Sequence, residues 1–164
     1  MAEVVIITAV SLDGIIGKEG KLPWHVSEDM KRFKSLTTGY PVIMGRKTAE
    51  GFPKALPNRR NVILSQSGYS KEGFETAESL GEALLNCRAN ERIFIIGGGK
   101  VYKKALEFAD RIELTRIQQR IGKGSDVVYF PDIDPAKWEI VYSRGGAECI
   151  FYTYLPKKGR KAIE

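Results

Sequence analysis

The chain has 164 residues, of which 43% are hydrophobic and 28% are charged. This length and composition predict a single domain, residues 1–164, with a substantial core, and no internal repeat or low-complexity segment is present. The formal net charge of +6 suits polyanionic small ligands, and it would also suit nucleic acid.

No apolar run approaches the length that a membrane-spanning helix needs, and the segment Val4–Ile7 is too short and lacks the basic flank of a signal peptide. Cys87 and Cys149 have neither the spacing of metal ligands nor that of a disulfide framework. We therefore expect a cytoplasmic protein with two reduced thiols, no metal site and no membrane partner.

Alternating apolar runs and helical patterns predict an α/β fold with a mostly parallel, twisted sheet of about eight strands and helices on both faces. The last two strands, joined through Gly145–Gly146, are expected to form an antiparallel hairpin at the sheet edge. The polar, glycine-flanked segment Gly17–Lys21 is expected to be a mobile loop. In chain order, the expected strands are 4–10, 42–44, 61–65, 74–76, 92–96, 111–118, 138–144 and 149–155, and the expected helices are 27–36, 47–51, 79–86 and 100–108.

The segment Leu22–Asp29 places a carboxylate at the start of the first expected helix, for which Ser27 is the predicted N-cap. Asp29, Met30, Phe33 and Leu36 are expected to lie along one face of that helix. An acid in the first turn of a helix can simply stabilise the helix through its interaction with the helix dipole. Alternatively, it can be kept in an apolar pocket for proton transfer or ligand binding. On the second interpretation, a pocket of Leu22, Trp24, Met30 and Phe33 would raise the pKa of Asp29 by desolvation.

Two glycine turns follow buried strands and begin helices. The first is Gly45–Thr48, where two cations and a hydroxyl at a helix start are typical of an anion site. The second is Gly97–Tyr102, which occupies a similar position after the strand 92–96. Neither turn has the phosphate-loop pattern of nucleotide kinases, and Tyr102 stands where the Rossmann fingerprint has its third glycine. Two such turns together favour a dinucleotide-binding site that contacts its ligand at both turns.

Together, these motifs closely resemble dihydrofolate reductases of the bacterial type. The motifs follow the family's order along nearly the whole chain, and their spacing requires no gap until about residue 120. The resemblance implies NADPH-dependent reduction of 7,8-dihydrofolate to 5,6,7,8-tetrahydrofolate, in a monomer that antifolates inhibit. It is carried by Ile15–Gly17, Leu22–Trp24, Asp29, Phe33–Lys34, Pro41–Thr48, Leu56–Asn61, Ile96–Tyr102, Leu114–Thr115 and Tyr129–Pro131.

The resemblance also implies roles for particular residues. Asp29, Leu22, Trp24 and Thr115 would form the catalytic centre, and Asp29 would favour protonation of the pterin. Substrate contacts would come from Ile7, Asp29, Met30, Phe33, Lys34, Phe52, Lys54, Arg59 and Thr115, with Arg59 on the glutamate carboxylate. Cofactor contacts would come from Ala9, Ile16, Gly17, Lys21, Gly45, Arg46, Lys47, Thr48, Leu64, Ser65, Gln66, Ile96, Gly97, Gly98, Gly99, Lys100, Val101 and Tyr102.

Some segments depart from the family pattern and leave two alternatives open. The segment Val10–Gly14 is similar to the reductases of riboflavin synthesis, which share the fold and NADPH, although they lack the Leu-Pro-Trp motif and the acid at position 29. A non-catalytic nucleotide-binding or nucleic-acid-binding domain would explain the charge and the basic tail 157–161 but would leave Asp29 unused. Gln66 replaces a frequent arginine, and the loop Gly122–Val128 is one residue longer than usual, so the role of Asp126 stays open.

Overall fold

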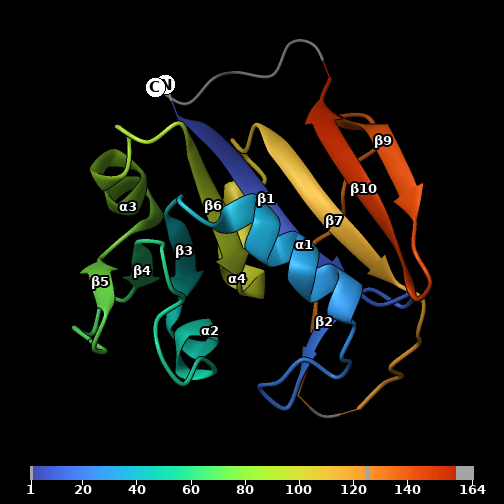
Figure 1. The fold of residues 1–164 in the computed structure, drawn as a ribbon, viewed down its shortest axis with the longest axis horizontal. Helices are drawn as coiled ribbons and strands as arrows, with labels where there is room; N and C mark the ends of the chain where they lie inside the picture. The colour runs from blue at the N-terminus through green and yellow to red at the C-terminus, as the bar shows by residue number, and fades with distance from the viewer. Residues whose placement is uncertain (1, 125, 158–164) are drawn as a thin grey trace.

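An eight-stranded sheet forms the centre of this computed structural model, which describes residues 2–124 and 126–157. Its strand order is β5-β4-β3-β6-β1-β7-β10-β9 (Figure 1). Neighbours from β5 to β7 are parallel, and β10 pairs antiparallel with both β7 and β9. The predicted α/β class and the antiparallel hairpin at the edge are thus confirmed. The strands are β1 (Glu3–Val10), β3 (Val42–Gly45), β4 (Asn61–Leu64), β5 (Phe74–Ala77), β6 (Arg92–Gly97), β7 (Arg111–Ile117), β9 (Trp138–Gly145) and β10 (Cys149–Pro156).

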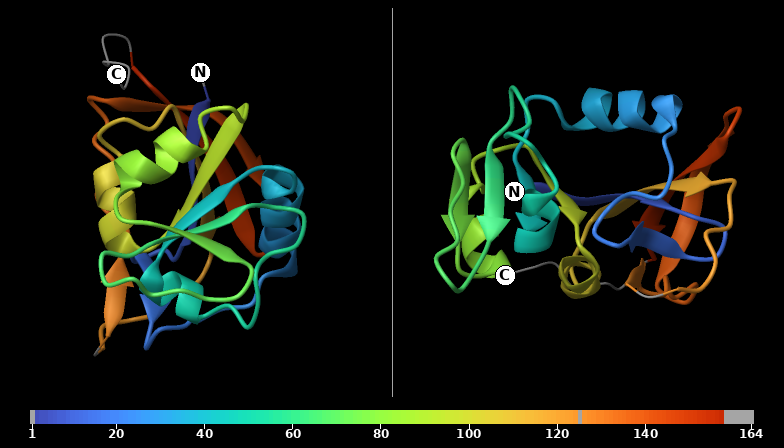
Figure 2. Two further views of the ribbon diagram at one scale, coloured as in Figure 1. Left: turned by 90° about the vertical axis from the view of Figure 1, so that its left-hand side faces the viewer. Right: turned by 90° about the horizontal axis from the view of Figure 1, so that it is seen from below.

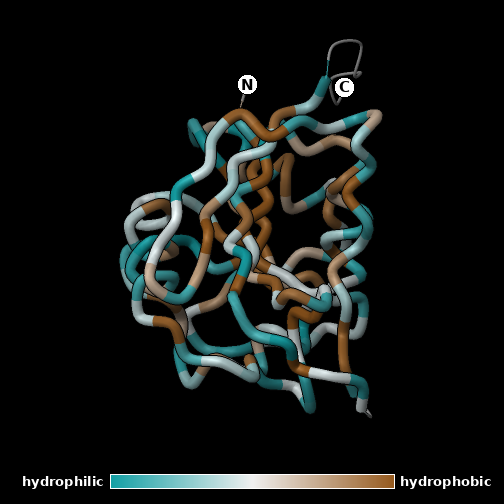
Figure 3. Tube along the Cα trace, turned by 90° about the vertical axis from the view of Figure 1, so that its right-hand side faces the viewer, coloured by the Kyte–Doolittle hydropathy of each residue, from teal (hydrophilic) through white to brown (hydrophobic). Residues whose placement is uncertain are grey.

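Side chains of the central strands alternate between two apolar clusters on opposite faces of the sheet. In β1, Val4 and Ile6 belong to one cluster, whereas Val5 and Ile7 belong to the other. Both sets are buried, which is why the central strands read as continuous apolar runs rather than as an alternating pattern. Figure 3 shows these hydrophobic segments at the centre and hydrophilic segments around them.

Helices cover both faces of the sheet, as predicted. Helix α1 (Ser27–Thr37) lies over one face, and α3 (Leu80–Asn86) and α4 (Gly99–Ala105) lie over the other (Figure 2). The short helix α2 (Arg46–Glu50) follows β3 directly. No helix in the described part of the chain has the length and apolar character needed to cross a membrane.

The structure corrects two local predictions. Residues 15–18 form a strand, β2 (Ile15–Lys18), which pairs antiparallel with β8 (Val127–Tyr129), so Gly17 and Lys18 are not part of a mobile loop. The partner strand lies more than a hundred residues away, and short-range patterns therefore give no signal for this pairing. The N-cap of α1 is Val26 rather than Ser27, and it makes no side-chain capping bond. Residues 158–161 of the basic tail lie outside the described residues.

Candidate active site

The Asp29 carboxyl in the first turn of α1 interacts with the Thr115 side chain on β7, so two residues from distant parts of the chain meet above the sheet. Thr115 is only 4% exposed, and its hydroxyl stabilises the charged form of the carboxyl. Burial raises the pKa of Asp29 above its ordinary value of 3.8, while the Thr115 hydroxyl and the charge of Arg32 act in the opposite direction. The predicted direction of the pKa shift is confirmed.

The predicted composition of the pocket around Asp29 is wrong for two of its four members. Leu22 is 62% exposed and Met30 is 54% exposed. Adjacent residues of a helix point about 100° apart, so Met30 lies to one side of the direction in which Asp29 points and does not bury it. The residues that share the face of Asp29 are Arg32, Phe33 and Leu36, at the spacing of one and two helical turns.

Trp24 adds a buried polar donor close to this helix. Its side chain packs with Val26, Ile117 and Phe151, and the residue is 9% exposed. Its indole Nε1 is buried and has no hydrogen-bond partner within residues 2–124 and 126–157. An unmet buried donor costs free energy, so this N–H group is ready to donate to a ligand or to an ordered water.

The structure brings together three of the apolar residues that were assigned to the substrate. Ile7 on β1 is in the buried cluster on the α1 face of the sheet, and Phe33 and Phe52 are partly buried against that cluster. The two aromatic residues are only partly buried and keep exposed surface. Leu36 and Leu56 are partly buried against the same cluster, and neither was assigned a substrate contact from the sequence.

Arg59 is held between the end of α1 and the turn before β4. Its Nε donates to the Pro57 carbonyl at 2.9 Å, and its NH1 group donates to the Thr37 hydroxyl at 2.9 Å. The buried amide of Asn61 fixes the turn by bonding Leu56 and the Arg59 carbonyl. Arg59 is therefore an oriented, partly buried cation, whereas the nearby candidates Lys34 and Lys54 are exposed.

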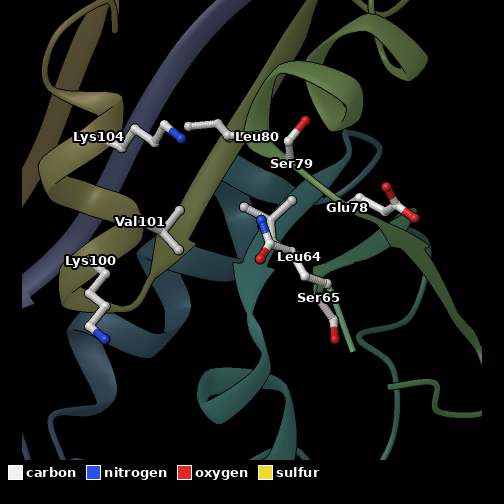
Figure 4. Close-up of a pocket in the computed structure, with 9 residues that line it drawn as sticks. Leu64, Ser65, Glu78, Ser79, Leu80, Lys100, Val101 and Lys104 are labelled. Atoms are coloured by element: carbon white, nitrogen blue, oxygen red, sulfur yellow. The ribbon is translucent and has the colours of Figure 1, made fainter. Parts of the chain in front are cut away.

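A pocket of about 230 Å³ lies between β4 and the starts of α3 and α4 (Figure 4). Five predicted cofactor residues line it: Leu64, Ser65, Gln66, Lys100 and Val101. Glu78, Ser79, Leu80 and Lys104 complete the lining, and none of these four was assigned to the site. Lys104 follows Lys100 by one helical turn, so the sequence did hold a signal for it.

The two glycine turns lie side by side. A Cβ atom on Gly45 would lie 3.3 Å from Val101 and 3.8 Å from the Gly98 nitrogen, and one on Gly97 would lie 3.1 Å from the Thr48 hydroxyl. Such close backbone approach explains why these turns need glycine. The contacts between the two turns also bring together the two parts of the predicted dinucleotide site, Gly45–Thr48 and Gly97–Tyr102. The neighbouring Ile96, also a predicted cofactor contact, is partly buried.

Two predicted cofactor residues use their side chains within the protein. The Tyr102 hydroxyl donates to the Ile7 carbonyl at 2.8 Å and so joins α4 to β1. Arg46 pairs with Glu50 at 2.8 Å and stacks over the Tyr69 ring. Lys47 is exposed beside Arg46 at the start of α2.

The segment expected to contact the nicotinamide is tied to a distant loop by Asp13, which the candidate set omitted. The Asp13 carboxylate accepts from the Ser11 hydroxyl at 2.6 Å and from the Gly122 amide at 2.8 Å. These bonds hold its pKa well below the ordinary value. Ala9 and Ile16 are partly buried nearby in the chain, and Lys21 is exposed. Asp126 accepts the Glu19 amide through its backbone carbonyl at 3.0 Å.

Comparisons with known proteins agree with this arrangement. The dihydrofolate reductase family profile matches residues 3–154. Dihydrofolate reductase of Haemophilus influenzae is 38% identical over 137 residues and 84% of each chain. That of Neisseria gonorrhoeae is 36% identical over 165 residues, which cover 98% of this chain and all of the relative. The structure of Enterococcus faecalis dihydrofolate reductase complexed with NADP(H) and RAB-propyl superposes with a TM-score of 0.88 at 32% identity, covering 95% of this chain and 97% of that one.

The fold and the site define an NADPH-dependent oxidoreductase. The chain belongs to the dihydrofolate reductase family, and its reaction is the reduction of dihydrofolate. The riboflavin-pathway reductase and the non-catalytic binding domain receive no support from these comparisons.

The raised pKa of Asp29 has a consequence for stability. The folded protein releases this proton at higher pH than the unfolded chain, so the buried charge costs stability increasingly as pH rises above 3.8. We expect Asp29→Asn to raise the Tm of the ligand-free protein at pH 7 but not at pH 3.5. At this size, 1 kcal/mol corresponds to about 2–4 °C in Tm, which thermal denaturation at both pH values resolves. The exposed Asp132→Asn is the control, and equal Tm values for Asp29→Asn and wild type at pH 7 would contradict the burial argument.

Proposed function

We propose that Asp29, Thr115 and Trp24 form the centre that orients and protonates dihydrofolate during its reduction. The observation that carries this proposal is the partly buried Asp29 carboxyl with a raised pKa, next to the buried Thr115. Asp29 accepts hydrogen bonds from the amino group and ring nitrogen of the pterin, and its charge favours protonation of the neighbouring nitrogen. The unmet indole N–H of Trp24 is available to an acceptor on the same ring, directly or through water.

Apolar contacts position the rest of the substrate. Ile7, Phe33 and Phe52 bind the pterin and aminobenzoyl groups, which bury the aromatic surface that the ligand-free chain leaves exposed. Leu22 and Met30, both exposed, supply further apolar contact when ligands are bound. Arg59 pairs with the glutamate carboxylate, with Lys34 and Lys54 nearby.

The residues present fit the cofactor. Lys100, Lys104 and Ser65 in the 230 Å³ pocket match the phosphate of an adenosine 2′-phosphate, and Gly45–Thr48 and Gly97–Tyr102 offer backbone amides to a pyrophosphate. The NADPH bound there supplies the hydride. Residues 9–21 orient its nicotinamide through Ala9, Ile16 and Gly17 and exclude water from the reacting atoms.

We also propose that the chain acts as a cytoplasmic monomer that antifolates inhibit and that neither nucleic acid nor membrane is a partner. Free, buried Cys87 and Cys149 suit a reducing compartment.

A single assay tests the proposed function against its alternatives. The loss of nicotinamide absorbance is followed with NADPH and dihydrofolate, and turnover supports the proposal. NADPH binding without turnover would overturn it, and a ribosylamino-pyrimidine substrate would then separate the riboflavin-pathway reductase from a nucleotide-binding domain.

The role of Asp29 predicts a pH-dependent defect. Asp29→Asn keeps the shape but loses the charge, so turnover at pH 7 should fall by roughly a hundredfold or more, in line with general acid–base assistance. Protonation of dihydrofolate then depends on solvent, and the rate should recover as pH falls. NADPH affinity should hardly change. A rate close to wild type at neutral pH would mean that Asp29 serves only the helix dipole.

Arg59→Lys should weaken the binding of dihydrofolate roughly tenfold or more, because lysine cannot keep both bonds of Arg59 and a two-point carboxylate contact. The measurements are KM for dihydrofolate and Kd for NADPH. Arg60→Lys is the matched control, since that neighbour pairs with Glu75 instead. A loss confined to NADPH binding would place Arg59 on the cofactor side.

NADPH should be preferred to NADH, and Glu78 should reduce the margin because its negative charge lines the same pocket as Lys100. Glu78→Gln should increase the ratio of kcat/KM for NADPH to that for NADH about two- to fivefold, the effect of one exposed charge pair. The exposed Glu72→Gln should leave the ratio unchanged. Equal efficiency of the wild type with both cofactors would contradict the assignment of the phosphate site.

A further inference from the structure

Helix α1 is held on the sheet by polar contacts as well as by the apolar packing of Phe33 and Leu36. Thr37 at its end is its one fully buried residue within the described chain. At the other end, the Glu28 carboxylate accepts the Ala147 amide at 3.1 Å. Between them, Asp29 meets Thr115, and Arg32 pairs with Glu113 at 2.8 Å.

The Arg32–Glu113 ion pair lies next to the Asp29–Thr115 contact on both elements. Asp29 and Arg32 are one helical turn apart on α1, and Glu113 and Thr115 are two residues apart on β7, so they share one face of the sheet. The two contacts therefore form adjacent bridges from α1 to β7.

Two residues of β10 contact the Arg32–Glu113 ion pair. The Thr153 hydroxyl contacts both Glu113 carboxylate oxygens, at 3.0 and 2.9 Å, and Thr153 is the cross-strand partner of Glu113. The Arg32 guanidinium lies 4.8 Å from the centre of the buried Phe151 ring, which is the cross-strand partner of Thr115. Glu113 is further contacted by Arg111 at 3.4 Å. Arg32 is thus fixed by its ion pair with Glu113 and by stacking on Phe151, while Thr153 and Arg111 hold the Glu113 carboxylate.

Several groups reach Asp29 electrostatically. The positive charge of Arg32 on the same helix and the Thr115 hydroxyl on β7 both lower the pKa of Asp29. The buried Tyr102 hydroxyl on α4 and the Cys149 thiol on β10, which also contacts Glu28, are affected by its charge. Burial raises the pKa values of both these groups, so they stay neutral near pH 7. Arg144 on β9 stacks on the same Phe151 ring at 4.7 Å and acts on Cys149, whereas Arg32 is the cation that lowers the pKa of Asp29.

We propose that Arg32, fixed by Glu113, is a positioning residue that sets the pH range of the reaction by holding a positive charge one helical turn from Asp29. This inference rests on the proposed role of Asp29. Arg32 itself contacts neither pterin nor cofactor in the proposed mechanism and acts through the neighbouring carboxyl.

The test compares charge-neutralising variants with opposite expected effects. Arg32→Gln removes one positive charge and leaves Glu113 with Arg111 as its remaining cationic partner at 3.4 Å, so the pH midpoint of the hydride-transfer rate should rise by about half a pH unit or more. Glu113→Gln leaves Arg32 uncompensated, so the midpoint should fall. The double variant should have a pH midpoint close to that of the wild type. Arg32→Lys, which keeps the positive charge, should also have a midpoint close to the wild-type value.

The rates are measured by rapid mixing with NADPH and dihydrofolate, and thermal denaturation verifies that each variant is folded. Arg60→Gln and Glu75→Gln neutralise a pair with the same 2.8 Å separation, between the residue before β4 and a residue of β5, and they should not move the midpoint. Shifts of the two single variants in the same direction, or unchanged midpoints, would overturn the inference. If Arg32→Gln does not fold, Glu113→Gln and the double variant decide. A wild type without turnover would instead contradict the proposed function.

Discussion

Burial of both faces of the central parallel strands is the constraint on which the rest of the molecule depends. Strands β1, β3 and β6 send alternate residues into two separate apolar clusters, so each face needs a cover. On one face α3 and α4 provide it with buried residues such as Leu80 and Tyr102. On the other face α1 covers the strands incompletely, and apolar surface is left for a ligand to bury.

The incomplete cover explains the electrostatics of the site. A carboxyl group on the inner face of α1 is desolvated by the sheet but is not fully buried. The helix that carries it is positioned by hydrogen bonds and an ion pair, which are directional, in addition to the packing of Phe33 and Leu36. In the proposed mechanism, substrate binding and proton transfer are therefore linked to the same helix.

The sequence was sufficient for the main strands because their apolar runs are continuous, and for the glycine turns because glycine directly follows two of these runs. A Cβ atom at Gly97 or Gly45 would lie within 3.1 or 3.3 Å of Thr48 or Val101, which favours glycine there. The predicted apolar contacts Ile7, Phe33 and Phe52 also meet in one cluster. Strands β2 and β8 were missed because their pairing joins short segments far apart in the chain, and periodicity reports only local order.

Side-chain pairs across long separations could not be predicted either. Arg32 and Glu113 are ordinary charged residues in the sequence, and only the register of α1 on β7 makes them partners. Similarly, nothing in the sequence indicates that the Trp24 indole lacks a partner within the described residues. Met30 was assigned to the pocket because its apolar character was weighed above its angular position.

The strand order has a consequence for how the chain folds during synthesis. Strand β1 is synthesised before the other strands of this sheet, yet it lies in the middle of the sheet between β6 and β7. Its pairing partners span residues 92–97 and 111–117, so synthesis must reach residue 117 before β1 is enclosed. Until then, the apolar side chains of Val4–Ile7 stay available to chaperones and to other nascent chains. Closing this sheet joins distant segments, which is slow compared with helix formation.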